Sequence, residues 1–142
     1  MPSSERRQAR ERALSLLYEA ETKGQSPAEI VAEQVLDPDP FTTDVVTGVE
    51  TSGAEIDALI TRFSRNWPLE RMPALDRTLL RMGVYELAHR PDVPTGVVLS
   101  EIVDLASEYS TDDSGPFVNG VLAAIAAEVR IDGDPDPRPA AV

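Results

Sequence analysis

Residues 67–90, with the sequence WPLERMPALDRTLLRMGVYELAHR, decide which fold this chain can adopt. After Pro73, apolar residues recur too densely for a helix that contacts its neighbours along one narrow stripe. These residues are Leu75, Leu79, Leu80, Met82, Val84, Leu87 and Ala88. The same turns also carry the charged residues Asp76, Arg77, Arg81 and Glu86. We therefore predict a central helix that is buried on most sides, with its charges either paired or lying along a solvent-facing seam.

The segment before residue 67 predicts three helices. The first runs from Ser3 or Ser4 to Gly24, with small and apolar residues at helical spacing. A capping box with proline at the first helical position predicts a second helix over residues 26–35. A third opens at Thr42 or Thr43 and keeps one apolar register to residue 63. We expect it to continue across residue 53, although glycine inside a helix costs about 1 kcal/mol.

The rest of the chain predicts a single turn over residues 69–72, a helix over residues 95–109 and a last helix over residues 116–129. No segment alternates with the period of two that is typical of a strand. We therefore predict an all-α fold, a compact globular bundle of six or seven helices, formed by one domain over residues 1–130. Residues 131–142 are proline-rich and acidic and are expected to be disordered.

Composition excludes several classes of protein. The 142 residues are enough for one domain with a proper core. The chain has no cysteine, which rules out disulfides, thiolate zinc sites and a thiol nucleophile. No stretch approaches the length of apolar sequence that a membrane span needs, so we expect a soluble, cytoplasmic protein without a membrane partner.

The net charge of −12 argues against a polyanionic partner, but the charge is unevenly distributed. Residues 1–25 carry five basic and four acidic side chains, and residues 62–90 carry six and three. Residues 26–61 carry no basic and eight acidic side chains, and residues 91–142 carry two basic and ten acidic side chains. A local basic strip is therefore possible on an acidic protein if the two arginine-rich segments meet in the fold.

The sequence does not favour an enzyme. His89 is the only histidine, and its position at a helix end fits a cation that caps the helix. Asp112 and Asp113 lack the alternating ligands, central glycine and closing glutamate of a calcium loop, so helix capping explains them better. There is no glycine-rich phosphate loop. We expect no catalytic activity, no metal and no cofactor.

Four stretches, in this order and spacing, resemble the NusB family of bacterial transcription antitermination factors. They are RRQARERALSLLYE (6–19), LDRTLLRMGVYEL (75–87), SEIVDLASEYS (100–110) and DDSGPFVNGVL (112–122). The resemblance implies an all-helical RNA-binding protein that pairs with the ribosomal protein NusE. The pair binds single-stranded boxA RNA of ribosomal RNA leader transcripts and helps RNA polymerase resist termination. Thr95-Gly96 and Gly115-Pro116 stand where some relatives have basic residues, so NusE is expected to carry more of the RNA binding.

The resemblance and the residue chemistry together give candidate site residues. Basic groups that follow phosphates and flat side chains that stack on bases are typical of single-strand binding. The expected RNA-binding residues are Arg6, Arg7, Arg10, Tyr18, Arg81 and Phe117. The expected NusE interface consists of Asp76, Arg77 and Glu86.

Structural interpretations of the same residues remain open. The arginines at residues 6–10 could be a solvated helix start, although cations are unfavourable near a helix N-terminus. Arg77 and Glu86 could pair along their own helix, and Tyr18 and Phe117 could belong to the core. The alternative function is a helical adaptor that binds only proteins. If the RNA interpretation holds, we expect stability to hold or rise slightly when Arg7 and Arg10 are replaced by alanine. We also expect Asp76→Lys to weaken NusE binding and to leave thermal unfolding nearly unchanged.

Overall fold

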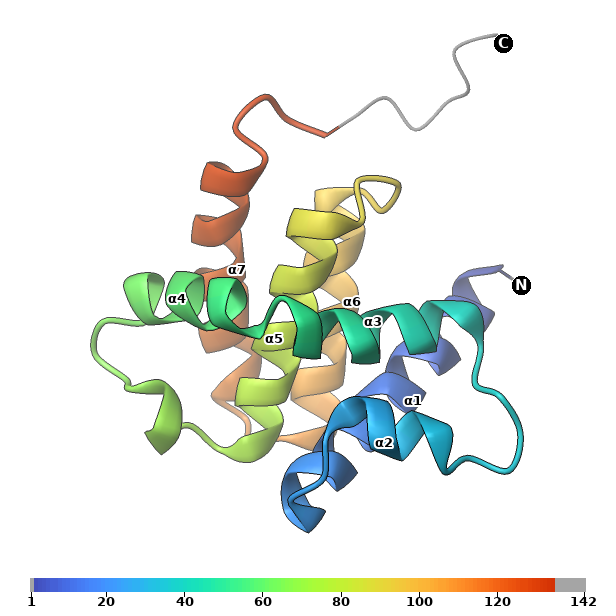
Figure 1. Ribbon diagram of the computed structural model, residues 1–142. Helices are drawn as coiled ribbons and strands as arrows, with labels where there is room; N and C mark the ends of the chain where they lie inside the picture. Colours follow the sequence, from blue (N-terminus) through green and yellow to red (C-terminus); the bar gives the residue numbers. More distant parts are fainter. Residues whose placement is uncertain (1, 135–142) are drawn as a thin grey trace, which may run out of the picture.

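The computed structural model describes residues 2–134, and these residues form seven α-helices and one short 3-10 helix without any strand (Figure 1). The all-α fold predicted from the sequence is confirmed. In chain order the elements are α1 (Pro2–Lys23), α2 (Pro27–Ala32), α3 (Pro40–Thr51), α4 (Gly53–Phe63), η1 (Leu69–Arg71), α5 (Ala74–His89), α6 (Thr95–Tyr109) and α7 (Ser114–Val129).

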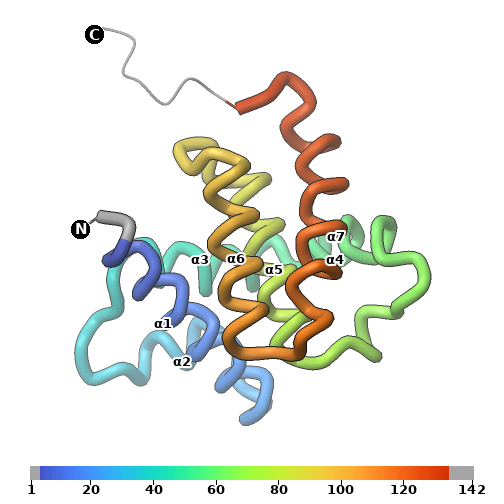
Figure 2. Tube along the Cα trace, turned by 180° about the vertical axis from the view of Figure 1, so that it is seen from behind, coloured from blue at the N-terminus to red at the C-terminus, as the bar shows by residue number. Residues whose placement is uncertain are grey.

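Helix α5 is the centre of the fold, as its apolar density predicted. It packs against α1, α3, α4, α6 and α7. The two opposite views show α5 between a layer formed by α3 and α4 and a layer formed by α6 and α7, with α1 and α2 at one side (Figures 1 and 2). The side chains of Leu79, Leu80, Met82 and Val84 are fully buried. A single helix therefore supplies the contact surface for almost every other element.

Helices α3 and α5 approach closely at Gly48. A Cβ atom at this position would lie 2.2 Å from Cε1 of Tyr85, far inside van der Waals contact. The absence of a side chain therefore lets the Tyr85 ring lie against the α3 backbone. The Tyr85 hydroxyl donates a hydrogen bond of 2.8 Å to Asp44, one turn earlier on α3. This contact fixes α3 across the middle of α5.

The prediction of one continuous third helix was wrong. The chain turns at Ser52, where φ is −100° and ψ is 18°, and continues as α4. The start was also misplaced, because Asp39 rather than a threonine caps α3, accepting a hydrogen bond of 2.8 Å from the Phe41 amide. Thr42 is buried instead, and its hydroxyl donates to the carbonyl oxygen of Ala9 in α1. The threonine therefore serves packing between helices, which helical spacing cannot reveal.

Helix α2 is shorter than predicted. Its capping box between Ser26 and Glu29 forms as the sequence indicated. The helix nevertheless ends at Ala32, and Val35 is 99% exposed in the loop that follows. The side-chain amide of Gln34 donates to the carbonyl oxygen of Ile30, which satisfies the helix end and turns the chain outward.

The end of α7 is tied to the α5–α6 connection by Arg130. Its guanidinium donates to four backbone carbonyl oxygens, those of Glu86, Leu87, Arg90 and Val93, at 2.7–3.2 Å. Asp134 accepts a hydrogen bond of 3.0 Å from the Thr95 amide at the start of α6.

Of the tail predicted to be disordered, residues 135–142 lie outside the described part of the chain. Within the described part, no helix is long and apolar enough to cross a membrane.

Candidate nucleic-acid interface

The first turns of α1 carry Arg6 and Arg7 at the surface. Arg7 is 25% exposed and donates a hydrogen bond of 2.7 Å to Glu108, while Asp104 lies 3.7 Å away. Both carboxylates belong to α6. These pairs offset the unfavourable position of a cation near a helix N-terminus. Arg6 has no carboxylate within 4 Å among the described residues and packs over the Phe41 ring instead, 4.1 Å from its centroid.

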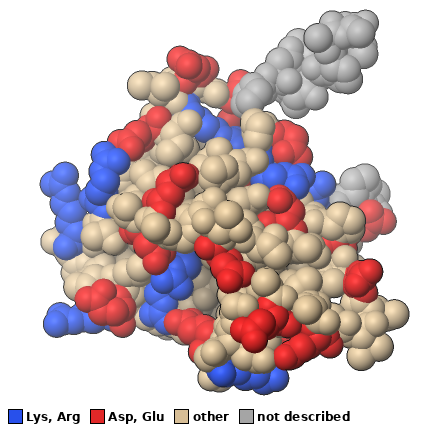
Figure 3. All heavy atoms as spheres, in the orientation of Figure 1, with Lys and Arg blue, Asp and Glu red and all other residues tan. Residues whose placement is uncertain are grey.

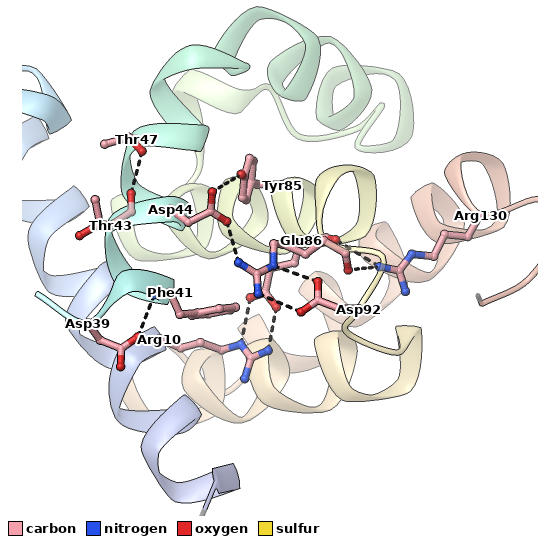
Figure 4. A network of polar contacts seen from close by, with 11 residues as sticks. Arg10, Asp39, Phe41, Thr43, Asp44, Thr47, Tyr85, Glu86, Asp92 and Arg130 are labelled. Atoms are coloured by element: carbon pink, nitrogen blue, oxygen red, sulfur yellow. Dashed lines mark hydrogen bonds and ion pairs between the residues drawn. The ribbon is translucent and has the colours of Figure 1, made fainter. Parts of the chain in front are cut away.

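Arg10, one turn further along α1, is almost completely buried. Its Nε and Nη2 donate to the Glu86 carboxylate of α5 at 2.9 and 2.7 Å (Figure 4). The side chains are 1% and 0% exposed. The sequence predicted Arg10 at an RNA surface and Glu86 at a partner interface, and the structure corrects both positions. The same burial argues against the expectation that Arg10 can be removed without loss of stability.

Three arginines surround Phe41, two from α1 and one from the end of α5. Arg90 and Arg10 lie 4.9 and 5.1 Å from the ring centroid, beside Arg6. Arg90 donates to Asp92 and Asp44 at 2.9–3.0 Å, and the hydrogen bonds from Arg90 lower the pKa of Asp92. Sequence reasoning missed this cluster, because the α1 arginines, Phe41 and Arg90 come from three distant parts of the chain.

Asp76 is also buried. Its carboxylate accepts hydrogen bonds of 2.8 and 2.9 Å from the Ser114 hydroxyl and a further one from Ser110. It therefore holds the start of α5 to the loop that precedes α7. The prediction that Asp76 lies at a partner interface, and that its replacement leaves unfolding unchanged, is corrected by this burial.

Arg77 and Arg81 pair with other helices, and neither pairs along α5. Arg77 contacts Glu21 of α1 and donates to the Met72 carbonyl oxygen at 3.1 Å. Arg81 donates to Asp57 of α4 at 2.8 and 3.0 Å. Glu21 and Arg81 line two adjoining hollows of about 270 and 310 Å³. On the face of the molecule seen in Figure 3, basic and acidic side chains are interspersed.

The predicted aromatic residues lie in two different hollows. Phe117 packs edge-on against Trp67, with the ring centroids 4.7 Å apart, beside a hollow of about 530 Å³. Tyr18 and Tyr109 are 43% and 44% exposed and border another of about 350 Å³. The Tyr109 hydroxyl donates to Glu11 at 2.7 Å, which raises its pKa to about 12. Tyr109 was not predicted as a site residue, and only its neighbourhood to Tyr18 in the fold indicates such a role.

Comparison with known proteins identifies the family. The NusB family model matches residues 7–127. The transcription antitermination protein NusB of Kineococcus radiotolerans is 46% identical over 125 residues, covering 85% of this chain and 92% of the relative. Its counterpart from Clavibacter michiganensis subsp. michiganensis is 47% identical over 133 residues, which cover 87% of this chain and 97% of the relative.

Solved structures agree with this result. T. maritima NusB superimposes with a TM-score of 0.80 at 32% identity, covering 92% of this chain and 93% of that one. A chain from a structure of the antitermination factors NusB and NusE in complex with double-stranded RNA superimposes with a TM-score of 0.73 at 31% identity. The match covers 87% of this chain and 96% of that one. The chain belongs to the NusB family.

Proposed function

We propose that this protein is a transcription antitermination factor that binds boxA-type single-stranded rRNA leader RNA together with NusE. The complex would promote processive rRNA transcription by RNA polymerase. The observation that carries this proposal is the identity of 46–47%, over most of both chains, to proteins named transcription antitermination protein NusB. A similar fold in a complex of NusB, NusE and RNA supports the choice of partners.

The geometry supports the start of α1 as part of the RNA surface. Arg7 reaches solvent beside α6, and Tyr18 is exposed further along the same helix. Cationic and flat side chains along one path are what a single strand requires. The ion pair of Arg10 with Glu86 supports this surface, because it fixes α1 on α5.

The proposed NusE surface differs from the one expected from the sequence. Asp76 and Glu86 are fully buried, so neither can contact a partner while the fold is in this state. We infer that Asp76 influences NusE binding through the exposed loop at residues 111–113, whose flanking serines it holds. Arg77 remains a candidate contact, although Glu21 already neutralises it.

The family assignment supports a non-catalytic role. The relatives are named for antitermination, and no cluster of three or more metal-ligating side chains occurs among residues 2–134. We propose that the protein works without a cofactor. Because bacterial transcription takes place in the cytoplasm, we expect it to act there.

A fluorescence anisotropy titration tests the proposal directly. Labelled boxA-like single-stranded RNA, its scrambled counterpart and the corresponding duplex are titrated with the protein, with and without NusE. We expect the boxA strand to bind more tightly than the scrambled strand and NusE to strengthen that binding. If NusE binds but the protein adds nothing to RNA affinity, the alternative of a protein-only adaptor is correct.

A further inference from the structure

A hollow between the first turns of α1 and α6 has a chemical character that the proposed function does not use. Its volume is about 400 Å³. It is lined by Arg6, Arg10, Gly96, Val97, Ser100 and Glu101. The α6 residues in this set come from the side of the helix that faces the start of α1. The hollow therefore adjoins the surface on which we place RNA.

Arg10 presents one unused donor to this hollow. Two of its nitrogens bind Glu86, whereas Nη1 has no hydrogen-bond partner among the described residues and points away from Glu86 (Figure 4). Every fully buried side-chain nitrogen or oxygen in residues 2–134 has a hydrogen-bond partner. Because Nη1 has none, it is not fully buried and reaches solvent. The remainder of Arg10 is fixed by burial. The donor is thus held rigidly at the wall of the hollow.

Glu101 supplies the complementary acceptor. Its carboxylate lies 3.7 Å from Nη1 of Arg10, too far for a hydrogen bond, and it has no hydrogen-bond partner among the described residues. The side chain is 24% exposed. Its two oxygens can accept two parallel N–H donors, while the adjacent Nη1 can donate to a carbonyl oxygen beside them. The hollow therefore matches a group with one acceptor and two donors along one edge.

We propose that this hollow binds a guanine base of the RNA, an inference that rests on the proposed RNA-binding function. Among the RNA bases, guanine alone presents a carbonyl oxygen beside two N–H donors on its Watson–Crick edge. Its O6 accepts from Nη1 of Arg10, and its N1 and N2 hydrogens bind Glu101. A phosphate is disfavoured, because it would face the Glu101 carboxylate.

Arg6 completes the site as a stacking surface. Its guanidinium already packs over Phe41 and lines the same hollow. Arginine planes stack on unpaired bases in single-stranded RNA. Gly96 contributes open space, since a Cβ atom at that position would meet nothing within 4 Å. In this arrangement Glu101 determines base specificity and Arg6 contributes affinity that does not depend on the base edge.

The test uses a strand of twelve uridines in which one central position is uridine, guanosine, inosine or adenosine. Inosine keeps O6 and N1–H but lacks the N2 amino group, so it loses one bond to Glu101. The full chain is titrated with each strand, with NusE present. We expect guanosine to bind roughly tenfold more tightly than adenosine, in line with the discrimination of a good bidentate contact, and inosine to lie between the two because it keeps one bond to Glu101. Glu101→Gln should reduce this preference to about twofold, because an amide can accept only one of the two donors.

Asp37→Asn is the matched control, since it removes one exposed negative charge from a loop outside the hollow. It should keep the full preference for guanosine. Equal binding of the guanosine and inosine strands by the unmodified protein overturns the guanine site but leaves the proposed RNA-binding function intact. A preference that persists in Glu101→Gln places guanine recognition elsewhere and also overturns it. If no strand binds at all, the proposed function fails together with this inference.

Discussion

Two neighbouring arginines of α1 serve different purposes. Arg7 lies at the surface and pairs with exposed acids of α6. Arg10, three residues later, is buried against Glu86 of α5. Exposed ion pairs contribute little to stability, and a ligand can replace one partner at small cost. The buried pair is different, because removing one partner leaves an uncompensated charge inside the protein.

This difference separates binding from folding along a single helix. Substitutions at the exposed Arg7 should change RNA affinity and leave the fold intact. Substitutions at the buried Arg10 should unfold the protein and reduce RNA binding together with the fold. Stability and binding therefore have to be measured on the same variants, beginning with the largest expected effect.

Breaking the buried pair should have the largest effect. Arg10→Ala leaves the Glu86 carboxylate buried without a partner, and we expect the free energy of unfolding to fall by about 3–5 kcal/mol. The double replacement Arg10→Met with Glu86→Leu removes both charges and should restore stability to within about 1 kcal/mol. Urea unfolding followed by circular dichroism measures both. If the single variant is as stable as the parent, the pair does not hold α1 on α5.

Removing the Asp76 carboxylate should have the next largest effect. Asp76→Ala removes the buried carboxylate to which the Ser114 and Ser110 hydroxyls donate, which should cost about 3 kcal/mol. Asp112→Ala is the control, because Asp112 is an exposed acid in the loop between Ser110 and Ser114. We expect its stability to change by less than about 0.5 kcal/mol. Thermal unfolding of the two variants checks this, and similar midpoints would contradict a structural role for Asp76.

The parts of the fold that the sequence predicted are those whose signal lies within one segment. The apolar density of residues 74–89 predicts a buried helix without reference to any neighbour, and the capping box at Ser26 marks a helix start by itself. The start of α3 was missed, because Asp39 and Thr42 are both acceptable caps and only packing against α1 distinguishes them. The break at Ser52 was missed because the apolar register continues through it.

The candidate site was harder to predict than the fold. Arg7 and Tyr18 were predicted to contact RNA, and both reach solvent, although exposure does not show that they bind it. Helical geometry could not find the partner of Arg10, which is 76 residues away on another helix. The hollow with Glu101 was missed for the same reason, since its donor and acceptor come from different helices. Polar pairs between distant segments leave no periodic trace in a sequence.

Alkaline pH offers a smaller test of the contact between α3 and α5. Burial and the hydrogen bond to Asp44 raise the pKa of Tyr85 to about 12. An unfolded tyrosine ionises near pH 10, so the contribution of Tyr85 to stability is complete below that pH and is lost as the pH rises toward 12. The loss is at most about 2.7 kcal/mol. Tyr85→Phe should flatten the fall in stability over this range relative to the parent, and parallel pH curves would contradict the shift.

The smallest expected change in free energy concerns the exposed turn of α1. Arg7→Ala removes one cation and its surface pairs, and stability should stay within about 0.5 kcal/mol because exposed pairs contribute little and the helix dipole disfavours a cation there. If Arg7 contacts a phosphate, the slope of log affinity against log salt should fall by roughly 0.7 for single-stranded RNA. Arg12→Ala removes the same charge from an exposed position further along α1 and should leave the slope unchanged. Because phosphate contacts carry no sequence information, Arg7→Ala should weaken boxA-like and scrambled strands by the same factor. If a folded Arg7→Ala variant keeps the parent's slope of log affinity against log salt, the RNA does not run over the start of α1.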